Sequence, residues 1–557
     1  MRMMDPAFCI SHSRRRAREW RSMLVLLPLL LLSFSVNSED LPQIVEKDGR
    51  HSMIVAGAPY LILGAQVNNS SAWPAALPKV WPAVQQLQAN TVYVPIAWEQ
   101  IEPTEGRFDF SFLDTLLSQA RERNLRLGLL WFATWKNNNP SYAPEWVKLN
   151  NGKYPRVVTA KGVTLNSLSP HSNATLQADR KAFVRLMRHL KQNDAQRTVI
   201  MVQVQNEPGT YGSVRDYSPT AEKMFRGQVP TELTRKLGKR RGSWQEVFAA
   251  DAEEFFHAWS VAHYIGQIAA AGKREYALPM YVNCALRDPF DPGKPGGYAS
   301  GGPTDNVLDI YRAAAPAIDV IAPDIYMRES KKYFRVLELY DRRDNPLFVA
   351  ETGNDTGYAR YFFATLGRGA IGFTPFGIDF TGYSNYPLGS KRTDATMVAP
   401  FAANYRLIAP IARKWAQLAA EKKVHGAAQP DDNASQKLEL GNVHATVSWN
   451  EWQFGMKEWT WAGKIDEPEG REIPDGGALI AELGTNEYLV TGRNARVTFG
   501  TAHKSSSTGF LLARVEEGHY GADGEWVFER VWNGDQTDYG LNFTTLPQLL
   551  RVKVGAY

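Results

Sequence analysis

Short apolar runs alternate with longer stretches of helical spacing from about residue 50 to residue 415. Eight of these runs have the length and the Val, Ile, Leu and Tyr content of buried parallel strands. They are YLILGAQV from Tyr60, TVYVPIAW from Thr91, LRLGLLWF from Leu125, TVIMVQVQ from Thr198, LPMYVNCA from Leu278, DVIAPDIY from Asp319, PLFVAE from Pro346 and AIGFTPF from Ala370. Eight such units predict an α/β fold, a (β/α)8 TIM barrel. The alternative, an open doubly wound sheet, lacks its Gly-rich first turn.

The pattern changes after about residue 425, where no long helical stretch remains. Short alternating segments such as NVHATVSW, EYLVTG and ARVTFG are separated by Gly, Asn and Asp turns. This pattern predicts a smaller all-β, sandwich-like module. We therefore expect a catalytic barrel over residues 39–422 and a C-terminal β domain over residues 423–557.

The first 38 residues have the pattern of a secretory signal peptide. The basic stretch SRRRAREWR precedes an apolar run at Met23–Leu32, and small residues follow. That run has about ten residues, whereas a membrane-spanning helix needs roughly 20. We expect an exported protein, periplasmic or extracellular, with no stable membrane span after processing. A membrane anchor is the alternative.

Charge and cysteine content exclude several classes of protein. Six Arg and two acidic residues lie within residues 1–38, so the rest of the chain has 57 basic against 56 acidic residues. A nucleic-acid partner, which needs a basic surface, is not expected. Cys9 and Cys284 are the two cysteines, and the first leaves with the signal peptide. Metal-ligand spacings, a P-loop and a dinucleotide fingerprint are absent from the sequence, so neither a metal nor a cofactor is expected.

Two predicted barrel strands end in a carboxylate. The fourth runs VIMVQVQNEPG and places Glu207 just past its end, and the seventh runs PLFVAETGN and ends at Glu351. The C-terminal ends of barrel strands carry the active sites of TIM-barrel enzymes. Paired carboxylates at such a mouth suit glycoside hydrolysis, because one protonates the leaving oxygen while the other attacks or stabilises the sugar. The alternative is that each Glu forms an ordinary surface ion pair.

These motifs resemble those of TIM-barrel retaining glycoside hydrolases. The segment VYVPIAWEQIEPTEGRFDFSFLDTLLSQARERNLRLGLL resembles the galactosidases of glycoside hydrolase families 35 and 42. QVQNEPGTYG resembles most closely family 35, in its branch of exported bacterial β-galactosidases. The resemblance covers most of residues 45–420.

The resemblance implies a role for five residues. Glu207 would be the general acid/base, with a raised pKa, and Glu351 the nucleophile. Asn206 would bond the sugar 2-hydroxyl, Tyr93 would contact the galactose and Tyr326 would bond the nucleophile. The implied mechanism is double displacement through a covalent galactosyl-enzyme, with the carboxyl groups about 5–5.5 Å apart.

The sequence also departs from the family 35 pattern. That family commonly carries an acidic residue after the third strand, where this chain has Lys136 and Asn137. Galactose preference is therefore less firmly predicted than hydrolase chemistry. Further candidates for the sugar pocket, each with packing as the alternative role, are Asn137, Trp131, Trp135, Tyr383 and Tyr386.

The expected function is that of a retaining exo-β-galactosidase acting on oligosaccharides with terminal β-linked galactose, xyloglucan fragments of plant walls among them. One alternative keeps the mechanism and changes the sugar, giving a β-glucosidase, β-mannosidase or β-xylosidase. Another is a carbohydrate-binding barrel without catalysis. The C-terminal module is expected to support the barrel, with polysaccharide binding or formation of a homodimer as alternatives.

Overall fold

The computed structural model describes residues 41–452, 455, 472–501, 509–521 and 523–557. The predicted signal peptide at residues 1–38 therefore lies outside the described residues. None of the helices in the described part combines the length and the apolar character needed to cross a bilayer.

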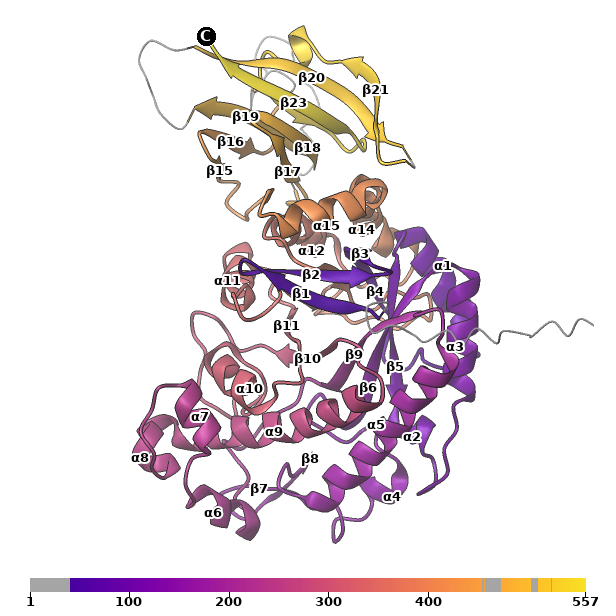
Figure 1. Ribbon diagram of the computed structural model, residues 1–557, viewed down its shortest axis with the longest axis vertical. Coiled ribbons are helices and arrows are strands. Elements are labelled where there is room, and N and C mark those ends of the chain that lie inside the picture. Colours follow the sequence, from indigo (N-terminus) through magenta and orange to yellow (C-terminus); the bar gives the residue numbers. More distant parts are fainter. Residues whose placement is uncertain (1–40, 453–454, 456–471, 502–508, 522) are drawn as a thin grey trace, which may run out of the picture. The chain divides into compact units, whose positions relative to one another are not determined.

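Eight parallel strands close into a barrel, in the order β10-β11-β12-β13-β4-β5-β6-β9 (Figure 1). The prediction of a TIM barrel is confirmed, and each of the eight apolar runs supplies one strand. The strands are β4 (Ile62–Gln66), β5 (Thr91–Ala97), β6 (Arg126–Lys136), β9 (Val199–Asn206), β10 (Met280–Ala285), β11 (Val320–Ile325), β12 (Phe348–Thr352) and β13 (Gly372–Pro375).

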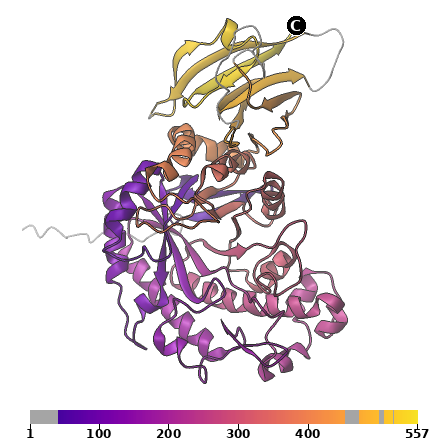
Figure 2. The same ribbon diagram turned by 180° about the vertical axis from the view of Figure 1, so that it is seen from behind.

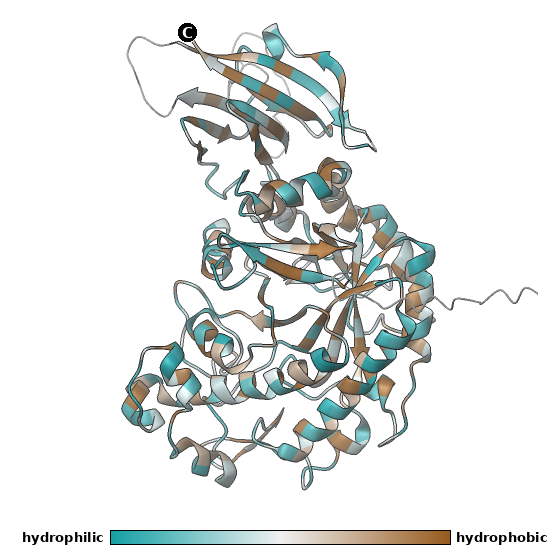
Figure 3. Cartoon of the chain, in the orientation of Figure 1, coloured by the Kyte–Doolittle hydropathy of each residue, from teal (hydrophilic) through white to brown (hydrophobic). Residues whose placement is uncertain are grey.

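Helices surround the barrel strands in both views (Figures 1 and 2). Their apolar stripes face the strands and their polar faces point outward, so brown and teal alternate along them in Figure 3. Helix α1 shows the pattern, because Leu77, Val80, Val84 and Leu87 recur at helical spacing and are all buried. The main helices are α1 (Leu77–Leu87), α3 (Ser111–Glu122), α5 (Asn173–Asn193), α9 (Ala252–Glu275), α10 (Leu308–Ala314), α11 (Ser330–Tyr340), α13 (Tyr361–Gly367), α14 (Ala395–Ile408) and α15 (Ala412–Ala420).

The barrel strands bury both faces, which explains their nearly continuous apolar sequence. One face fills the barrel interior with side chains that include Ile62, Leu130, Phe132 and Phe348. The other face packs against the helices in a separate, larger cluster. Additional elements are the sheet β1 (Gln43–Lys47), β2 (Arg50–Val55) and β3 (Ala58–Pro59), the hairpin β7 (Arg156–Val158) and β8 (Thr164–Leu168), and the short helices α2 (Trp98–Ile101), α4 (Glu145–Lys148), α6 (Pro219–Phe225), α7 (Thr231–Lys236), α8 (Trp244–Phe248) and α12 (Thr356–Ala359).

The C-terminal region is built from antiparallel strands, as predicted. One sheet has six strands in the order β14-β17-β18-β23-β20-β21, and the other has four in the order β15-β16-β19-β22. A third hydrophobic cluster lies among these strands. The strands are β14 (Val424–Ala428), β15 (Gln436–Leu440), β16 (Val443–Ser448), β17 (Gly477–Gly484), β18 (Glu487–Arg493), β19 (Ala495–Thr501), β20 (Phe510–Tyr520), β21 (Trp526–Val531), β22 (Leu541–Phe543) and β23 (Leu549–Ala556). The boundary at residue 422 stays a prediction.

Candidate active site

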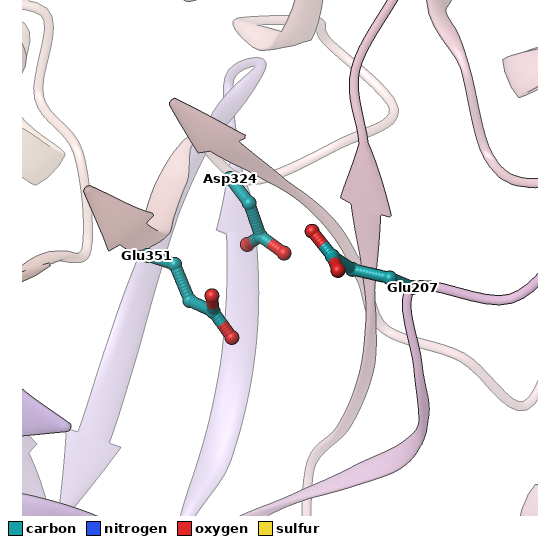
Figure 4. A group of neighbouring side chains, drawn as sticks. All are labelled: Glu207, Asp324 and Glu351. Atoms are coloured by element: carbon teal, nitrogen blue, oxygen red, sulfur yellow. The ribbon is translucent and has the colours of Figure 1, made fainter. Parts of the chain in front are cut away.

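Three carboxyl groups converge at the C-terminal ends of the barrel strands (Figure 4). Glu207 follows β9, Asp324 lies near the end of β11 and Glu351 lies near the end of β12. One oxygen of each lies within 4.8 Å of the others. The structure thus brings together the two acids predicted from the sequence and adds a third.

An unusual backbone conformation places Glu207. Gln205 and Glu207 both have positive φ, 67° and 43°, a conformation that costs free energy in residues with a side chain. The Gln205 side chain turns toward the helices, where its Nε2 donates to Asp179 Oδ2 at 2.7 Å. The Glu207 N–H donates to Asn283 Oδ1 at 2.8 Å. Strain of this kind persists where surrounding contacts hold it, and it concentrates at functional sites.

The Glu351 carboxylate accepts hydrogen bonds from four side chains. Gln66 Nε2 donates to its Oε1 at 2.7 Å, and Tyr326 Oη donates to its Oε2 at 2.9 Å. Asn206 Nδ2 and Asn283 Nδ2 lie 3.3 Å from Oε1. Four donors around a carboxylate that is 4% exposed stabilise its ionised form and fix its orientation.

Burial raises the pKa of Glu207 to about 7, and the negative charge of Glu351 adds to the effect. The Lys136 ammonium acts in the opposite direction. At neutral pH Glu207 therefore exchanges readily between its acid and its carboxylate, as a group that both gives and takes a proton must. The raised pKa agrees with the sequence prediction for this residue.

Three polar side chains of the site were not predicted. They are Gln66 at the end of β4, Asn283 in β10 and Asp324 in β11. Asn283 Nδ2 also donates to Asp324 Oδ2 at 2.6 Å, so its amide contacts all three acidic residues. One feature of the sequence could have identified them: each is a polar residue near the C-terminal end of an otherwise apolar strand, in LGAQV, YVNCA and APDIY.

Tyr326 and Asn206 contact the predicted nucleophile, whereas Tyr93 lies inside the barrel. Tyr93 is 0% exposed, and its ring packs at 6.2 Å from that of Tyr281 and 5.7 Å from that of Phe348. This position indicates packing of the barrel interior rather than contact with a sugar.

Trp131 and Trp135 were candidates for the sugar pocket, and the structure places both elsewhere. Trp131 Nε1 donates to Asp179 Oδ1 at 2.8 Å, and Asp179 belongs to helix α5. Trp135 packs at 4.8 Å from the ring of Tyr264 on helix α9. Both indoles therefore lie between the barrel and its helices. Because both faces of strand β6 are apolar, the sequence does not show which face a given Trp occupies.

The remaining candidates lie in loops that follow the barrel strands. Asn137 is exposed and accepts a hydrogen bond from Lys136 Nζ, directly after β6. Tyr383 and Tyr386 follow β13 and are 62% and 55% exposed. Lys391 Nζ lies 4.5 Å from the centre of the Tyr386 ring.

A cleft of about 600 Å³ lies among these loops. It begins at Asn68, two residues after the Gln66 that contacts Glu351, and its wall includes the exposed Trp73 and Tyr383 and the half-buried Tyr142. Asp379 joins the loops after β4 and β13, since it accepts hydrogen bonds from Asn68, Ser71 and Thr381. Amide, hydroxyl and aromatic groups in one cleft suit the polar edges and apolar faces of a sugar ring.

The three carboxyl groups are spaced closely enough to hold a cation. The surroundings of Glu351 do not suit a cation, because Gln66, Asn206, Asn283 and Tyr326 turn hydrogen-bond donors toward its carboxylate. A cation bound to Glu351 Oε1 would have to share that oxygen with three N–H groups. The donor set therefore fits a carboxylate nucleophile better than a metal ligand.

Comparison with known proteins gives two family matches within the chain. Residues 72–261 match the glycoside hydrolase 42 family, described as beta-galactosidase, and residues 401–544 match a domain of unknown function. A search of curated proteins gives no match. The first match confirms the expectation of a glycoside hydrolase domain of the β-galactosidase type. It does not single out family 35.

Several solved structures have a similar arrangement over part of their length. The β-galactosidase from Bacillus circulans sp. alkalophilus is 14% identical, with a TM-score of 0.46 over 65% of this chain and 60% of that one. The β-galactosidase from Marinomonas ef1 is 13% identical, with a TM-score of 0.45 over 64% and 62%. The β-amylase catalytic domain from Paenibacillus polymyxa is 14% identical, with a TM-score of 0.42 over 57% and 91%. The chain spans about three fifths of the length of these two β-galactosidases, and identities this low transfer no substrate.

Proposed function

We propose that the protein is a retaining exo-β-galactosidase that releases terminal β-linked galactose from oligosaccharides. Glu351 is the nucleophile and Glu207 the general acid/base. The observation that carries the proposal is the contrast between the two acids: four donors surround Glu351, while burial raises the pKa of Glu207 to about 7. Environments that separate two carboxyl groups in this way assign one to nucleophilic attack and the other to proton transfer.

The reaction proceeds in two displacements. A Glu351 oxygen attacks the anomeric carbon, and the bond to the leaving oxygen breaks while Glu207 gives that oxygen its proton. Glu207, now a carboxylate, then takes a proton from water, whose oxygen attacks the same carbon and returns the bonding electron pair to Glu351. One oxygen of Glu207 lies within 4.8 Å of one oxygen of Glu351. This short separation agrees with a retaining mechanism, since inverting enzymes hold their carboxyl groups roughly 6.5–9.5 Å apart.

The choice of galactose rests on the family match over residues 72–261 and on the sequence resemblance. The finer placement in the exported branch of family 35 rests mainly on the segment QVQNEPGTYG. Lys136 at the end of β6 and Asn137 directly after it stand where family 35 commonly has an acidic residue, and this is the reason to test glucose, mannose and xylose as well. Export, action on plant-wall oligosaccharides such as xyloglucan fragments, and a homodimer remain parts of the proposal that rest on sequence.

The test is hydrolysis of nitrophenyl β-glycosides by wild type, Glu351→Ala and Glu207→Ala, with azide added. We expect wild type to cleave the galactoside, and each variant to lose at least about a hundredfold in kcat/KM. Azide should yield β-galactosyl azide with Glu207→Ala and the α anomer with Glu351→Ala. Glu99→Ala, in the short helix α2 that follows β5, is a matched control whose kcat/KM should stay within about twofold of the wild-type value.

The outcomes separate the parts of the proposal. Cleavage of a different β-glycoside would keep the mechanism and replace the sugar. Binding of sugars without turnover of any substrate would favour a carbohydrate-binding barrel. Azide products of the opposite anomers would exchange the roles of the two acids.

A further inference from the structure

Asp324 is a third carboxyl group in a site whose reaction uses two. It is 3% exposed and lies on β11, between the strands that carry Glu207 and Glu351 in the order β9-β10-β11-β12. In Figure 4 its carboxyl group faces that of Glu207.

Hydrogen bonding distinguishes the two oxygens of Asp324. Asn283 Nδ2 donates to Oδ2 at 2.6 Å. Oδ1 is buried and has no hydrogen-bond partner among the described residues. An ionised carboxylate buried with a single donor would be costly, whereas a protonated one can place its O–H toward an acceptor. Glu207 is the neighbouring group that becomes such an acceptor when it gives up its proton.

The charges around Asp324 also favour its neutral form. Burial, then Glu351 and Glu207, raise its pKa well above the ordinary value, and Lys136 is the opposing cation. The other titratable groups that face it have raised pKa values and are uncharged at neutral pH; they are Tyr281, Cys284, Tyr326 and Tyr340. The single ammonium group balances the charge of one carboxylate. The other two carboxyl groups are therefore more stable when they are protonated.

We propose that Asp324 is a positioning residue, a neutral carboxylic acid that donates a hydrogen bond from Oδ1 to the Glu207 carboxylate formed when the leaving group departs. This inference rests on the proposed glycosidase function. Asp324 keeps its proton throughout: Glu207 gives its own proton to the leaving oxygen in the first displacement and regains one from water in the second. The added hydrogen bond stabilises the galactosyl-enzyme stage, in which Glu207 is ionised.

The test compares Asp324→Asn with Asp324→Ala in the pH dependence of kcat/KM, on whichever glycoside the wild type cleaves. In Asp324→Asn an amide N–H replaces the O–H donor. Its kcat/KM should therefore stay within about threefold of the wild-type value, and the basic limb of its pH profile should not move. Asp324→Ala loses the donor, so its kcat should fall at least about tenfold and its basic limb should move to higher pH. Asp341→Asn, a partly buried acid at the end of α11, is the matched control and should change neither.

Two results would overturn the inference. If Asp324→Asn moves the basic limb down by one pH unit or more, it has removed a negative charge, and Asp324 is ionised in the working enzyme. If kcat/KM falls equally in Asp324→Asn and Asp324→Ala and the basic limb of the pH profile does not move, Asp324 has a purely structural role. Infrared difference spectra of wild type against Asp324→Asn at pH 7 should show a protonated carboxyl band. That measurement needs no turnover, so it decides the protonation state even if wild type hydrolyses nothing and the proposed function itself fails.

Discussion

Gln66 and Glu351 are 285 residues apart in the chain, yet Gln66 Nε2 donates a hydrogen bond of 2.7 Å to Glu351 Oε1. Closure of the barrel makes this contact possible, because β13 lies between the first strand, β4, and the strand β12 that carries Glu351. The bond fixes the orientation of the buried carboxyl group of the proposed nucleophile.

Replacing this donor should slow the reaction. A hydrogen bond to a charged group contributes about 1.5–3 kcal/mol, so Gln66→Leu should lower kcat/KM by roughly 10- to 100-fold. Gln177→Leu, on the exposed side of α5, is the control and should have no such effect. A loss below about twofold for Gln66→Leu would show that the other donors suffice to hold Glu351.

The pH profile should report the raised pKa of Glu207. Because the acid must be protonated to assist the leaving group, kcat/KM should fall as the pH rises through about 7. Lys136 favours the carboxylate, so Lys136→Met should let Glu207 keep its proton to higher pH and move the basic limb upward by about 0.5–1 unit. Lys148→Met, whose ammonium pairs with Glu99, should leave the limb in place. A downward shift for Lys136→Met would contradict this account.

The same burial should make the folded state sensitive to pH. The pKa of Glu207 is about 7 in the folded state and about 4.5 in the unfolded state, so the folded state binds more protons between these values. Stability is then lost as the pH rises through this window. Glu207→Gln cannot ionise, so its free energy of unfolding should exceed that of wild type by on the order of 1–3 kcal/mol at pH 8 and by much less at pH 5. Urea unfolding at both pH values measures this, with Glu99→Gln as control, and equal differences at the two pH values would refute it.

The sequence predicted the barrel well because its strands are apolar on both faces and are separated by helices of clear periodicity. It also located Glu207 and Glu351, since Glu207 directly follows β9 and Glu351 lies near the end of β12. Which way a residue within a strand points was harder to predict. Leu130 and Phe132 fill the barrel interior, while Trp131 between them packs against the helices.

Polar residues inside the strands posed a related problem. Gln66, Asn283 and Asp324 are separated by more than 250 residues in total, and their meeting depends on barrel closure and on strand register, which the apolar pattern does not specify. The positive φ of Gln205 is a further feature that the apolar pattern does not predict. It turns this side chain toward α5, whereas Asn206 reaches Glu351.

Trp131 should matter for stability and not for sugar binding. Trp131→Phe removes the N–H that bonds the buried Asp179, and an unsatisfied buried acceptor costs about 1–3 kcal/mol. We therefore expect a lower melting temperature with KM for the cleaved glycoside within about twofold of wild type. Trp81→Phe, which removes a similar indole donor to Gln119 at the partly buried surface, should cost less stability. A selective rise in KM for Trp131→Phe would return this residue to the sugar site.

The cleft beside Gln66 should distinguish long substrates from short ones. Trp73 is 52% exposed on its wall, and an exposed indole offers a flat apolar face to a sugar ring. A methyl galactoside has no second ring to reach the cleft, whereas an oligosaccharide does. Trp73→Ala should therefore raise KM for an oligosaccharide by about five- to tenfold and leave kcat/KM for methyl β-galactoside within about twofold. Phe290→Ala, which removes an aromatic side chain that is 51% exposed and is not part of this cleft's wall, is the control. Equal losses on both substrates would indicate that Trp73 supports the catalytic centre itself, and no loss on either would remove the cleft from the substrate path.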